Sequence, residues 1–190
     1  MKKTVRILAL VLTALMCFMA FGCSKPSKNE VLDAFKELYP KAALINEYVY
    51  GAGLPYDGEY NIEELDSPHY VAVSDSSPYK SIAELEAAVL EVYSEGYYTD
   101  VLKAVLFAGV SADGQGLMGI SPRYKEVNGV LYTDVTYSKL NLISCDAEKA
   151  YIVEIKSRSA IVGAPRSGQT KDKNSTMVLT DKGWRFDFLA

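Results

Sequence analysis

The stretch Arg123–Thr136, RYKEVNGVLYTDVT, decides the fold class of this chain. Two runs, Arg123–Val127 and Val130–Thr136, flank the pair Asn128-Gly129. An Asn-Gly pair supplies both positive-φ residues of a type I′ turn, which is the strongest short-range signal for a β-hairpin. We therefore expect the chain to change from helices to short strands at Arg123.

Downstream of this hairpin the sequence predicts further strands, because short runs of β-forming residues alternate with polar turns. In one of them, Tyr151–Ser157, successive residues alternate between two faces, of which one is uniformly apolar and the other is mixed. Asp181-Lys182-Gly183 is a turn before the last strand, whose Trp184 we expect in the core. The strands expected after the hairpin are Lys139–Ser144, Tyr151–Ser157, Thr176–Thr180 and Trp184–Leu189, with Ala164–Ser175 as a polar loop.

Upstream, two capping boxes predict helices. Ser27 with Glu30 opens the first helix, which Pro40 is expected to bend or end, while Ala42–Tyr50 can continue it for two turns. Its apolar face consists of Val31, Leu32, Phe35, Leu38 and Tyr39.

Ser81 with Glu84 opens the second helix, and Gly96 suits its end. Thr99 is expected to cap a further short helix that reaches Leu106. The core stripe of the second helix is Ile82, Leu85, Ala88, Val89 and Val92. A short strand is expected earlier, at Tyr70–Val73.

Helices followed by antiparallel strands form an α+β order. We expect N-terminal helices packed on one curved antiparallel sheet of five to six strands, which is the cone of the cystatin and nuclear-transport-factor-like folds.

The first 23 residues have the features of a secretory signal. Lys2, Lys3 and Arg6 precede an apolar run from Ile7 to Phe21. The segment Ala20-Phe21-Gly22-Cys23 resembles the lipobox of bacterial lipoproteins, which implies diacylation of Cys23 and cleavage before it. A plain membrane-anchor helix is the alternative, but the run is shorter than the ~20 residues that span a bilayer. The expected divisions are a signal peptide at 1–22, lipidated Cys23 with a linker to 27, and one domain at 28–190.

Charge and cysteine content narrow the possible partners. The chain carries a net charge of −4, and loss of the three basic residues before Cys23 leaves 17 basic against 24 acidic residues, or −7. This balance disfavours nucleic acid, which needs a basic face, and attraction to anionic lipid head groups. Only Cys145 would remain as a free thiol, and we expect it to be a small buried residue rather than a nucleophile.

No set of residues in the sequence predicts catalysis, a cofactor or a metal site. His69 is the only histidine. Asp66, Ser67 and His69 are the residue types of a catalytic triad, but their adjacency in the sequence does not imply the geometry of one. A zinc site needs several ligands at recognisable spacing. Glu63 and Glu64 are expected to be solvated in an acidic loop. Ser111–Gly116 lacks the lysine of a phosphate-binding loop.

Two features indicate a binding surface. Ten of the 14 tyrosines lie between Tyr39 and Tyr98, and tyrosine is enriched at binding surfaces, although these rings could equally fill the core. The Gly109–Pro122 loop carries apolar residues that either enter a partner's groove or fold back onto the sheet. These residues are Leu117, Met118 and Ile120.

The order of these elements resembles a known family. The segments SIAELEAAVLEVYSEGYYTDVL, Arg123–Tyr132 and Gly183–Phe188 are similar to the IseA-type DL-endopeptidase inhibitors and related Gram-positive lipoproteins. The resemblance covers about Lys28 to Phe188. It implies a cell-envelope protein that blocks cell-wall peptidases by occupying their cleft, and it carries no inhibitory residues onto this chain.

The leading expectation is therefore a non-enzymatic lipoprotein on the extracytoplasmic face of the membrane. Its partners would be the bilayer, through acylated Cys23, and a cell-wall peptidase. The alternatives are a ligand-binding or isomerase-like pocket inside the cone, which would use Tyr and Asp, and a purely structural spacer.

Overall fold

The computed structural model describes residues 25–108, 121–137, 139–140, 142, 144–166 and 172–189. Within them the chain has an α+β fold, which confirms the predicted class. None of the described helices is long and apolar enough to cross a membrane. Cys23, Leu117, Met118 and Ile120 lie outside the described residues.

The longest element is helix α2 (Lys28–Tyr50), which begins where the capping signal predicts. The Ser27 hydroxyl accepts a hydrogen bond from the Glu30 N–H at 3.1 Å. Pro40 does not end the helix, because a buried stripe continues past it to Val49, and burial of this stripe stabilises further helical turns. The helix ends at Gly51, whose N–H donates to the Glu47 carbonyl at 3.0 Å.

Helix α3 (Ile82–Val92) also begins as predicted, since the Ser81 hydroxyl accepts from the Glu84 N–H at 3.2 Å. It ends before Gly96, which lies instead inside the short helix α4 (Glu95–Tyr97). The cap of that segment is Ser94 and not Thr99, because the Ser94 hydroxyl accepts from the Tyr97 N–H at 3.1 Å. Two π-helical segments follow, η2 (Tyr98–Leu102) and η3 (Ala104–Ala108).

The strands form two antiparallel sheets, so the expectation of a single curved sheet is wrong. The three-stranded sheet has the order β1-β3-β2, and its β2–β3 turn has the positive φ values of 53° at Asn128 and 76° at Gly129 that the sequence predicts. Its strands are β1 (Tyr70–Ala72), β2 (Tyr124–Val127) and β3 (Val130–Asp134). The four-stranded sheet has the order β4-β5-β6-β7. Its strands are β4 (Tyr151–Ile155), β5 (Ser159–Ala164), β6 (Lys173–Thr180) and β7 (Gly183–Phe188).

The segment between β3 and β4 explains why the sheet is divided. A strand was expected at 139–144, but none of its described residues belongs to one. The Leu140 N–H donates to the Tyr50 carbonyl at the end of α2, and the Cys145 N–H donates to the Tyr39 hydroxyl. These two anchors are eleven positions apart on the helix, or about 16 Å along the axis. The connection therefore runs beside α2 and carries the chain from one sheet to the other.

Strand β5 is the strand that the sequence did not predict. It consists of Ser-Ala-Ile-Val-Gly-Ala and pairs with β4 on one side and β6 on the other. Four of its six residues are buried, so its sequence lacks the polar–apolar alternation that marks a half-exposed strand.

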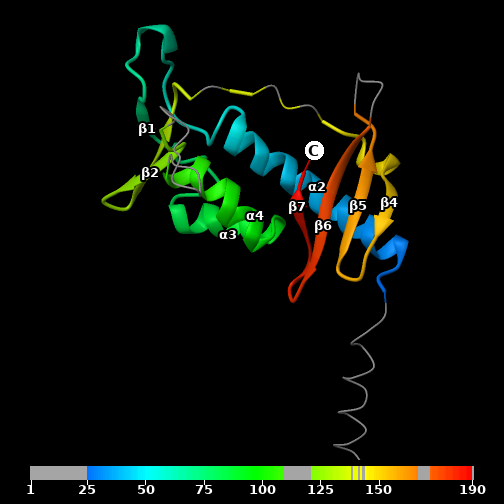
Figure 1. The fold of residues 1–190 in the computed structure, drawn as a ribbon. Coiled ribbons are helices and arrows are strands. Elements are labelled where there is room, and N and C mark those ends of the chain that lie inside the picture. The colour runs from blue at the N-terminus through cyan, green and yellow to red at the C-terminus, as the bar shows by residue number, and fades with distance from the viewer. Residues whose placement is uncertain are drawn as a thin grey trace, which may run out of the picture.

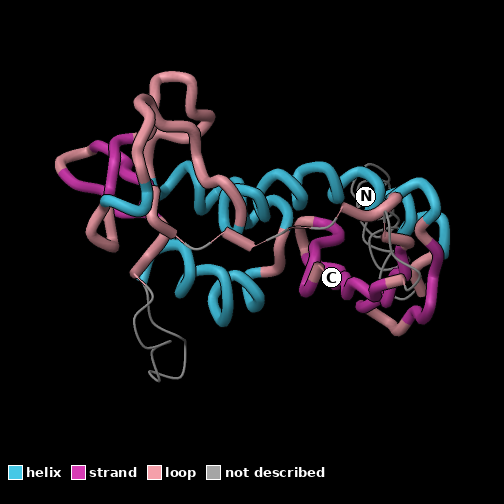
Figure 2. Tube along the Cα trace, turned by 90° about the horizontal axis from the view of Figure 1, so that it is seen from above, coloured by secondary structure: helices cyan, strands magenta, loops and turns pink. Residues whose placement is uncertain are grey.

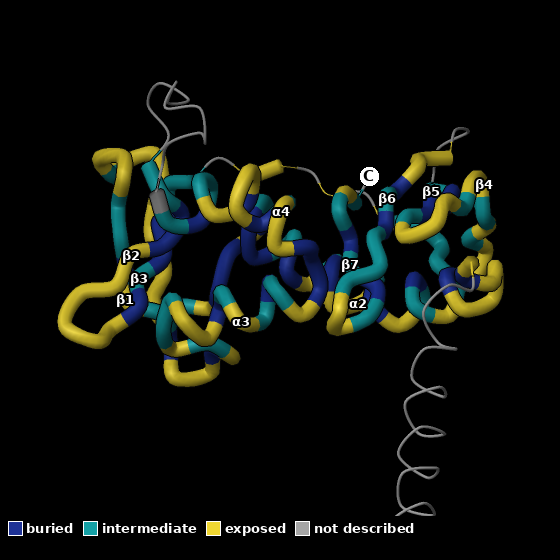
Figure 3. Tube along the Cα trace, turned by 60° about the horizontal axis from the view of Figure 1, so that its bottom comes forward, coloured by how far each residue is buried: buried dark blue, intermediate teal, exposed yellow. Residues whose placement is uncertain are grey.

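Helix α2 connects the two sheets (Figures 1 and 2). Phe35 in its first half packs edge-to-face on Phe186 of β7, with ring centroids 5.4 Å apart. Near its other end, the Tyr48 carbonyl accepts a hydrogen bond from the Tyr124 hydroxyl of β2 at 2.7 Å. One cluster of buried side chains contains residues of both sheets and of α2 and α3, and the buried segments in Figure 3 lie on the inner sides of these elements.

Trp184 lies in this core, as predicted, with 6% of its surface exposed. Trp184→Ala should lower the free energy of unfolding by about 3–5 kcal/mol because it leaves a large cavity. The indole Nε1 has no hydrogen-bond partner among the described residues, so Trp184→Phe should cost clearly less. Urea unfolding of both variants measures the difference. Equal stability of Trp184→Ala and the wild type would contradict the core assignment.

Candidate functional site

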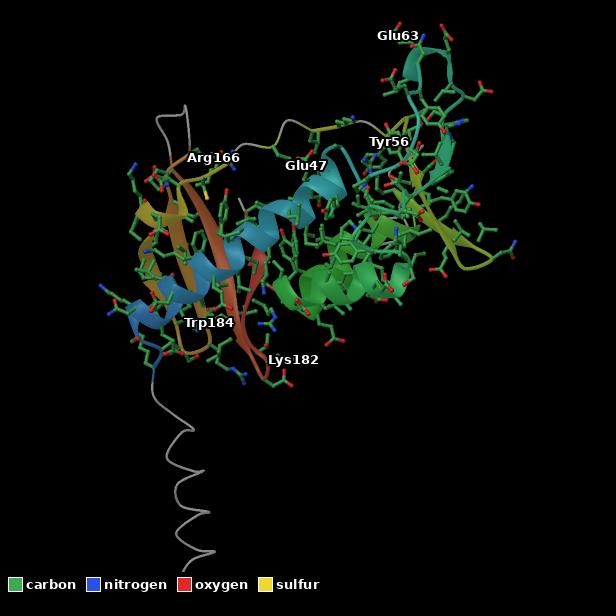
Figure 4. The ribbon with its side chains drawn as sticks, turned by 180° about the vertical axis from the view of Figure 1, so that it is seen from behind. Glu47, Tyr56, Glu63, Arg166, Lys182 and Trp184 are labelled. Carbon is green, nitrogen blue, oxygen red and sulfur yellow. The ribbon has the colours of Figure 1, made fainter. Side chains whose placement is uncertain are left out.

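The segment of residues 55–69, named here the acidic arch, projects from the three-stranded sheet. Its first end is joined to the residues that follow β1, because the Ser74 N–H donates to the Pro55 carbonyl at 2.8 Å and Tyr56 forms a bridge with Val73. Its outer part contains the single turn η1 (Ile62–Glu64). Figure 4 places Glu63 at its far tip and Tyr56 near its base.

Three aromatic rings support the inside of the acidic arch. The ring of Tyr60 lies 5.9 Å from that of Tyr56 and 5.7 Å from the imidazole of His69, centroid to centroid. Near the tip, the Asn61 side-chain amide donates to the Glu64 carboxylate at 2.6 Å. These contacts hold the segment in one conformation although most of its residues are exposed.

The outer surface of the acidic arch combines negative charge with apolar groups. Between residues 56 and 69 the sequence has no Lys or Arg, and five acidic residues are spread along it: Asp57, Glu59, Glu63, Glu64 and Asp66. Tyr60 is 38% exposed and Ile62 is 44% exposed. Exposed aromatic and aliphatic groups surrounded by charge are typical of protein-binding surfaces.

A buried carboxylate fixes the end of the acidic arch that leads into β1. Asp134 is buried, and its Oδ1 accepts from the N–H groups of His69 at 3.1 Å and Thr136 at 2.9 Å. The Thr136 hydroxyl donates to the same oxygen at 2.7 Å. In return the His69 carbonyl accepts from the Val135 N–H at 2.9 Å. The backbone of His69 is thereby joined to β3 from both sides.

Arg123 lies beneath this end and is only 1% exposed. Its guanidinium donates to the backbone carbonyls of Asp134 at 2.9 Å and Gly51 at 3.1 Å, and it lies 4.6 Å from the centre of the Tyr137 ring. The guanidinium forms no ion pair within the described part of the chain, and its Nε has no partner there. The charge is therefore stabilised by carbonyl dipoles and an aromatic face.

Gly53 makes room for this guanidinium. Its φ is +85°, a conformation that favours glycine, and a Cβ there would collide with Nη2 of Arg123. Arg123 thus joins the end of α2 to the sheet that carries the acidic arch.

The sequence did not predict the roles of Asp134 and Arg123. Both are charged residues within strand-forming runs, where exposure is the usual outcome. Gly51 and Gly53, which flank Ala52, were the only local sign that a large group approaches the backbone. The end of a helix accounts for two such glycines equally well.

The candidate groups for catalysis hold structural positions. The His69 imidazole lies tilted against the Tyr60 ring, and the His69 backbone is anchored as described. Cys145 is half-buried next to Tyr39, and burial raises the pKa of its thiol, which makes it a poorer nucleophile at neutral pH. Burial also raises the pKa of Tyr39 to about 12. No group of three or more His, Cys, Asp or Glu side chains that could hold a metal occurs within the described residues.

The tyrosines divide into two groups. Tyr48, Tyr93 and Tyr98 are buried in the core, which matches the core-filling alternative. Tyr56 and Tyr60 belong to the acidic arch and are partly or largely exposed. Glu63 and Glu64 are exposed at the arch, which is the solvated position expected for them. Ser111–Gly116, Leu117, Met118 and Ile120 lie outside the described residues.

No protein-family model matches the chain, and a search of curated proteins found no match.

Arg123→Lys should lower the free energy of unfolding by about 1.5–3 kcal/mol, the usual value of hydrogen bonds to a charged group. Lysine keeps the charge, but one ammonium cannot replace two forked hydrogen bonds and a stacked plane. Lys182→Met, at an exposed position in the β6–β7 turn, is the control and should change stability by less than 0.5 kcal/mol. Equal stability of Arg123→Lys and the wild type in urea unfolding would show that the described contacts of Arg123 contribute little.

Proposed function

We propose that this chain is a membrane-anchored lipoprotein of the extracytoplasmic face, whose folded domain binds a protein partner of the cell envelope without catalysing a reaction. The observation that carries the proposal is the acidic arch. It offers Tyr60 and Ile62 among carboxylates, on the opposite side of the molecule from the start of α2 (Figures 1 and 4).

The position of the lipobox-like segment supports this arrangement. Only four residues separate Cys23 from α2, since the helix begins at Lys28. A 23-residue helix is about 34 Å long. Acyl chains on Cys23 would hold one end of the domain at the bilayer, and α2 would extend the other end away from it.

The sharpest form of the proposal is inhibition of a cell-wall DL-endopeptidase, which the IseA-type resemblance implies. The acidic arch is the contact that we propose, because a narrow projecting segment with exposed apolar groups can enter a cleft. The sequence offers a second contact segment, the loop that holds Leu117 and Met118. Variants can separate the two.

Lipidation is tested at Cys23. Cys23→Ala should leave an uncleaved precursor that takes up no label from a fatty-acid probe, because the acylated thiol is missing. Ser24→Ala is the matched control and should be cleaved and labelled normally. Full labelling of Cys23→Ala would rule out lipidation at this residue.

Partner binding is tested with the mature chain, residues 23–190, carrying Cys23→Ser so that it stays soluble. It should lack hydrolase activity and slow a DL-endopeptidase at stoichiometric concentration. Ile62→Ser should weaken binding at least tenfold, or about 1.4 kcal/mol, with an unchanged melting temperature, because Ile62 is 44% exposed. Leu140→Ser is the control, because Leu140 is 60% exposed but lies beside α2.

Three other results would redirect the assignment. Loss of binding only in Leu117→Ser with Met118→Ser would move the contact to that loop. Loss of stability in the same variant would place its residues in the core. Absence of binding to any envelope peptidase would favour the structural spacer.

A further inference from the structure

The surface around the start of α2, named here the basal face, carries an excess of positive charge. It comprises residues 25–30, the β4–β5 turn with the end of β4 at 154–158, and the β6–β7 turn at 181–182. These segments contain five basic residues, Lys25, Lys28, Lys156, Arg158 and Lys182, against three acidic ones, Glu30, Glu154 and Asp181. All eight side chains belong to exposed residues.

The fold brings these segments together although they lie far apart in the sequence. Arg158 joins the β4–β5 turn to the end of β6, just before the β6–β7 turn, because its carbonyl accepts from the Leu179 N–H at 2.8 Å and its Nε donates to the Leu179 carbonyl at 3.1 Å. Both turns and the start of α2 lie at the bottom of the molecule in Figures 1 and 4, and Figure 4 shows Lys182 there. Lys156 also forms an ion pair with Glu154 at 3.7 Å, which offsets part of its charge.

The linker before α2 places this face next to the lipid anchor. Pro26 is buried, and Ser27 is fixed as the helix cap. The four residues from Cys23 to Ser27 can span at most about 14 Å. An acylated Cys23 would therefore keep the basal face within about that distance of the lipid head groups.

The net charge of −7 does not oppose such a contact, because electrostatic interactions are local in salt solution. The Debye length is about 8–10 Å at physiological ionic strength. The acidic arch lies beyond the far end of a helix that is about 34 Å long, so its carboxylates are screened from the bilayer. The charge of the nearest face, and not that of the whole chain, decides the sign of the interaction.

We propose that the basal face binds the anionic head groups of the bilayer in which Cys23 is anchored. The assignment rests on the proposed lipidation for its orientation. Acyl chains and a basic surface patch are complementary membrane signals. Together they hold α2 upright, so that the acidic arch points away from the membrane toward its partner.

The test uses the unacylated mature chain with Cys23→Ser, so that binding depends on the protein surface alone. Vesicles of phosphatidylglycerol and phosphatidylcholine in equal parts are compared with pure phosphatidylcholine by co-sedimentation at low ionic strength. The chain should bind only the anionic vesicles. Lys25→Glu with Lys156→Glu and Lys182→Glu should weaken this binding at least tenfold.

The matched control reverses the same number of charges elsewhere. Lys103, Lys139 and Lys173 are exposed residues outside the basal face, and their change to Glu gives the same net charge. This variant should keep its binding to within about twofold, because none of its changed charges belongs to the basal face.

Three results would overturn the assignment. They are an equal loss of binding in both triple variants, no binding to anionic vesicles by the wild type, and displacement from the vesicles by a soluble glycerol-phosphate polymer at equal phosphate concentration. The last result would assign the basal face to an anionic polymer. None of them depends on fatty-acid labelling of Cys23, so failure of this inference and failure of the proposed lipidation are distinguishable.

Discussion

The buried stripe along α2 is the constraint on which the rest of the structure depends. Its first half packs on the four-stranded sheet through Phe35, and its second half reaches the three-stranded sheet through Tyr48. A helix interrupted at Pro40 would end before the second contact. Burial of Ala42, Ile45 and Val49 beyond the proline outweighs the hydrogen bond that proline cannot donate. The two sheets therefore share one core and need no direct ladder between them.

At the second end of α2, the chain places charges inside the protein. Arg123 and Asp134 are both buried, but each is satisfied mainly by backbone groups and not by an opposite charge. Such contacts demand exact backbone positions, which Gly51, His69 and β3 provide. The consequence is a rigid base for a segment that has little core of its own. The acidic arch can expose Tyr60 and Ile62 because its ends are fixed elsewhere.

The distribution of charge gives the molecule two different ends. Acidic residues without any basic neighbour occupy the arch, and basic residues predominate on the basal face. The helix between them exceeds the screening length several-fold, so each end interacts with its surroundings independently. A single value of net charge conceals this difference. The balance of the whole chain disfavours attraction to anionic lipids, whereas we propose such attraction for the basal face from its local charge.

Local signals in the sequence determined much of the fold. The caps Ser27 and Ser81 and the Asn128-Gly129 turn are where the sequence predicts, because each depends on neighbouring residues only. The core stripes of α2 and α3 and the buried Trp184 are also where the sequence predicts, because their apolar pattern marks the side that must be buried. The α+β class follows from the order of these elements. The expected lipid anchor at Cys23 is likewise a property of one short segment.

Only the tertiary structure decided which strands pair, what Arg123 does and where the charges gather. The division into two sheets depends on Leu140 and Cys145 bonding to α2 instead of a strand. Strand β5 has no recognisable pattern because most of its residues are small or apolar and are buried in the folded chain. The basal face is formed by segments that are distant in sequence, and the acidic arch is fixed by remote contacts such as that of His69 with Asp134. Such features depend on contacts between remote residues, and a linear pattern does not record which remote residues will meet.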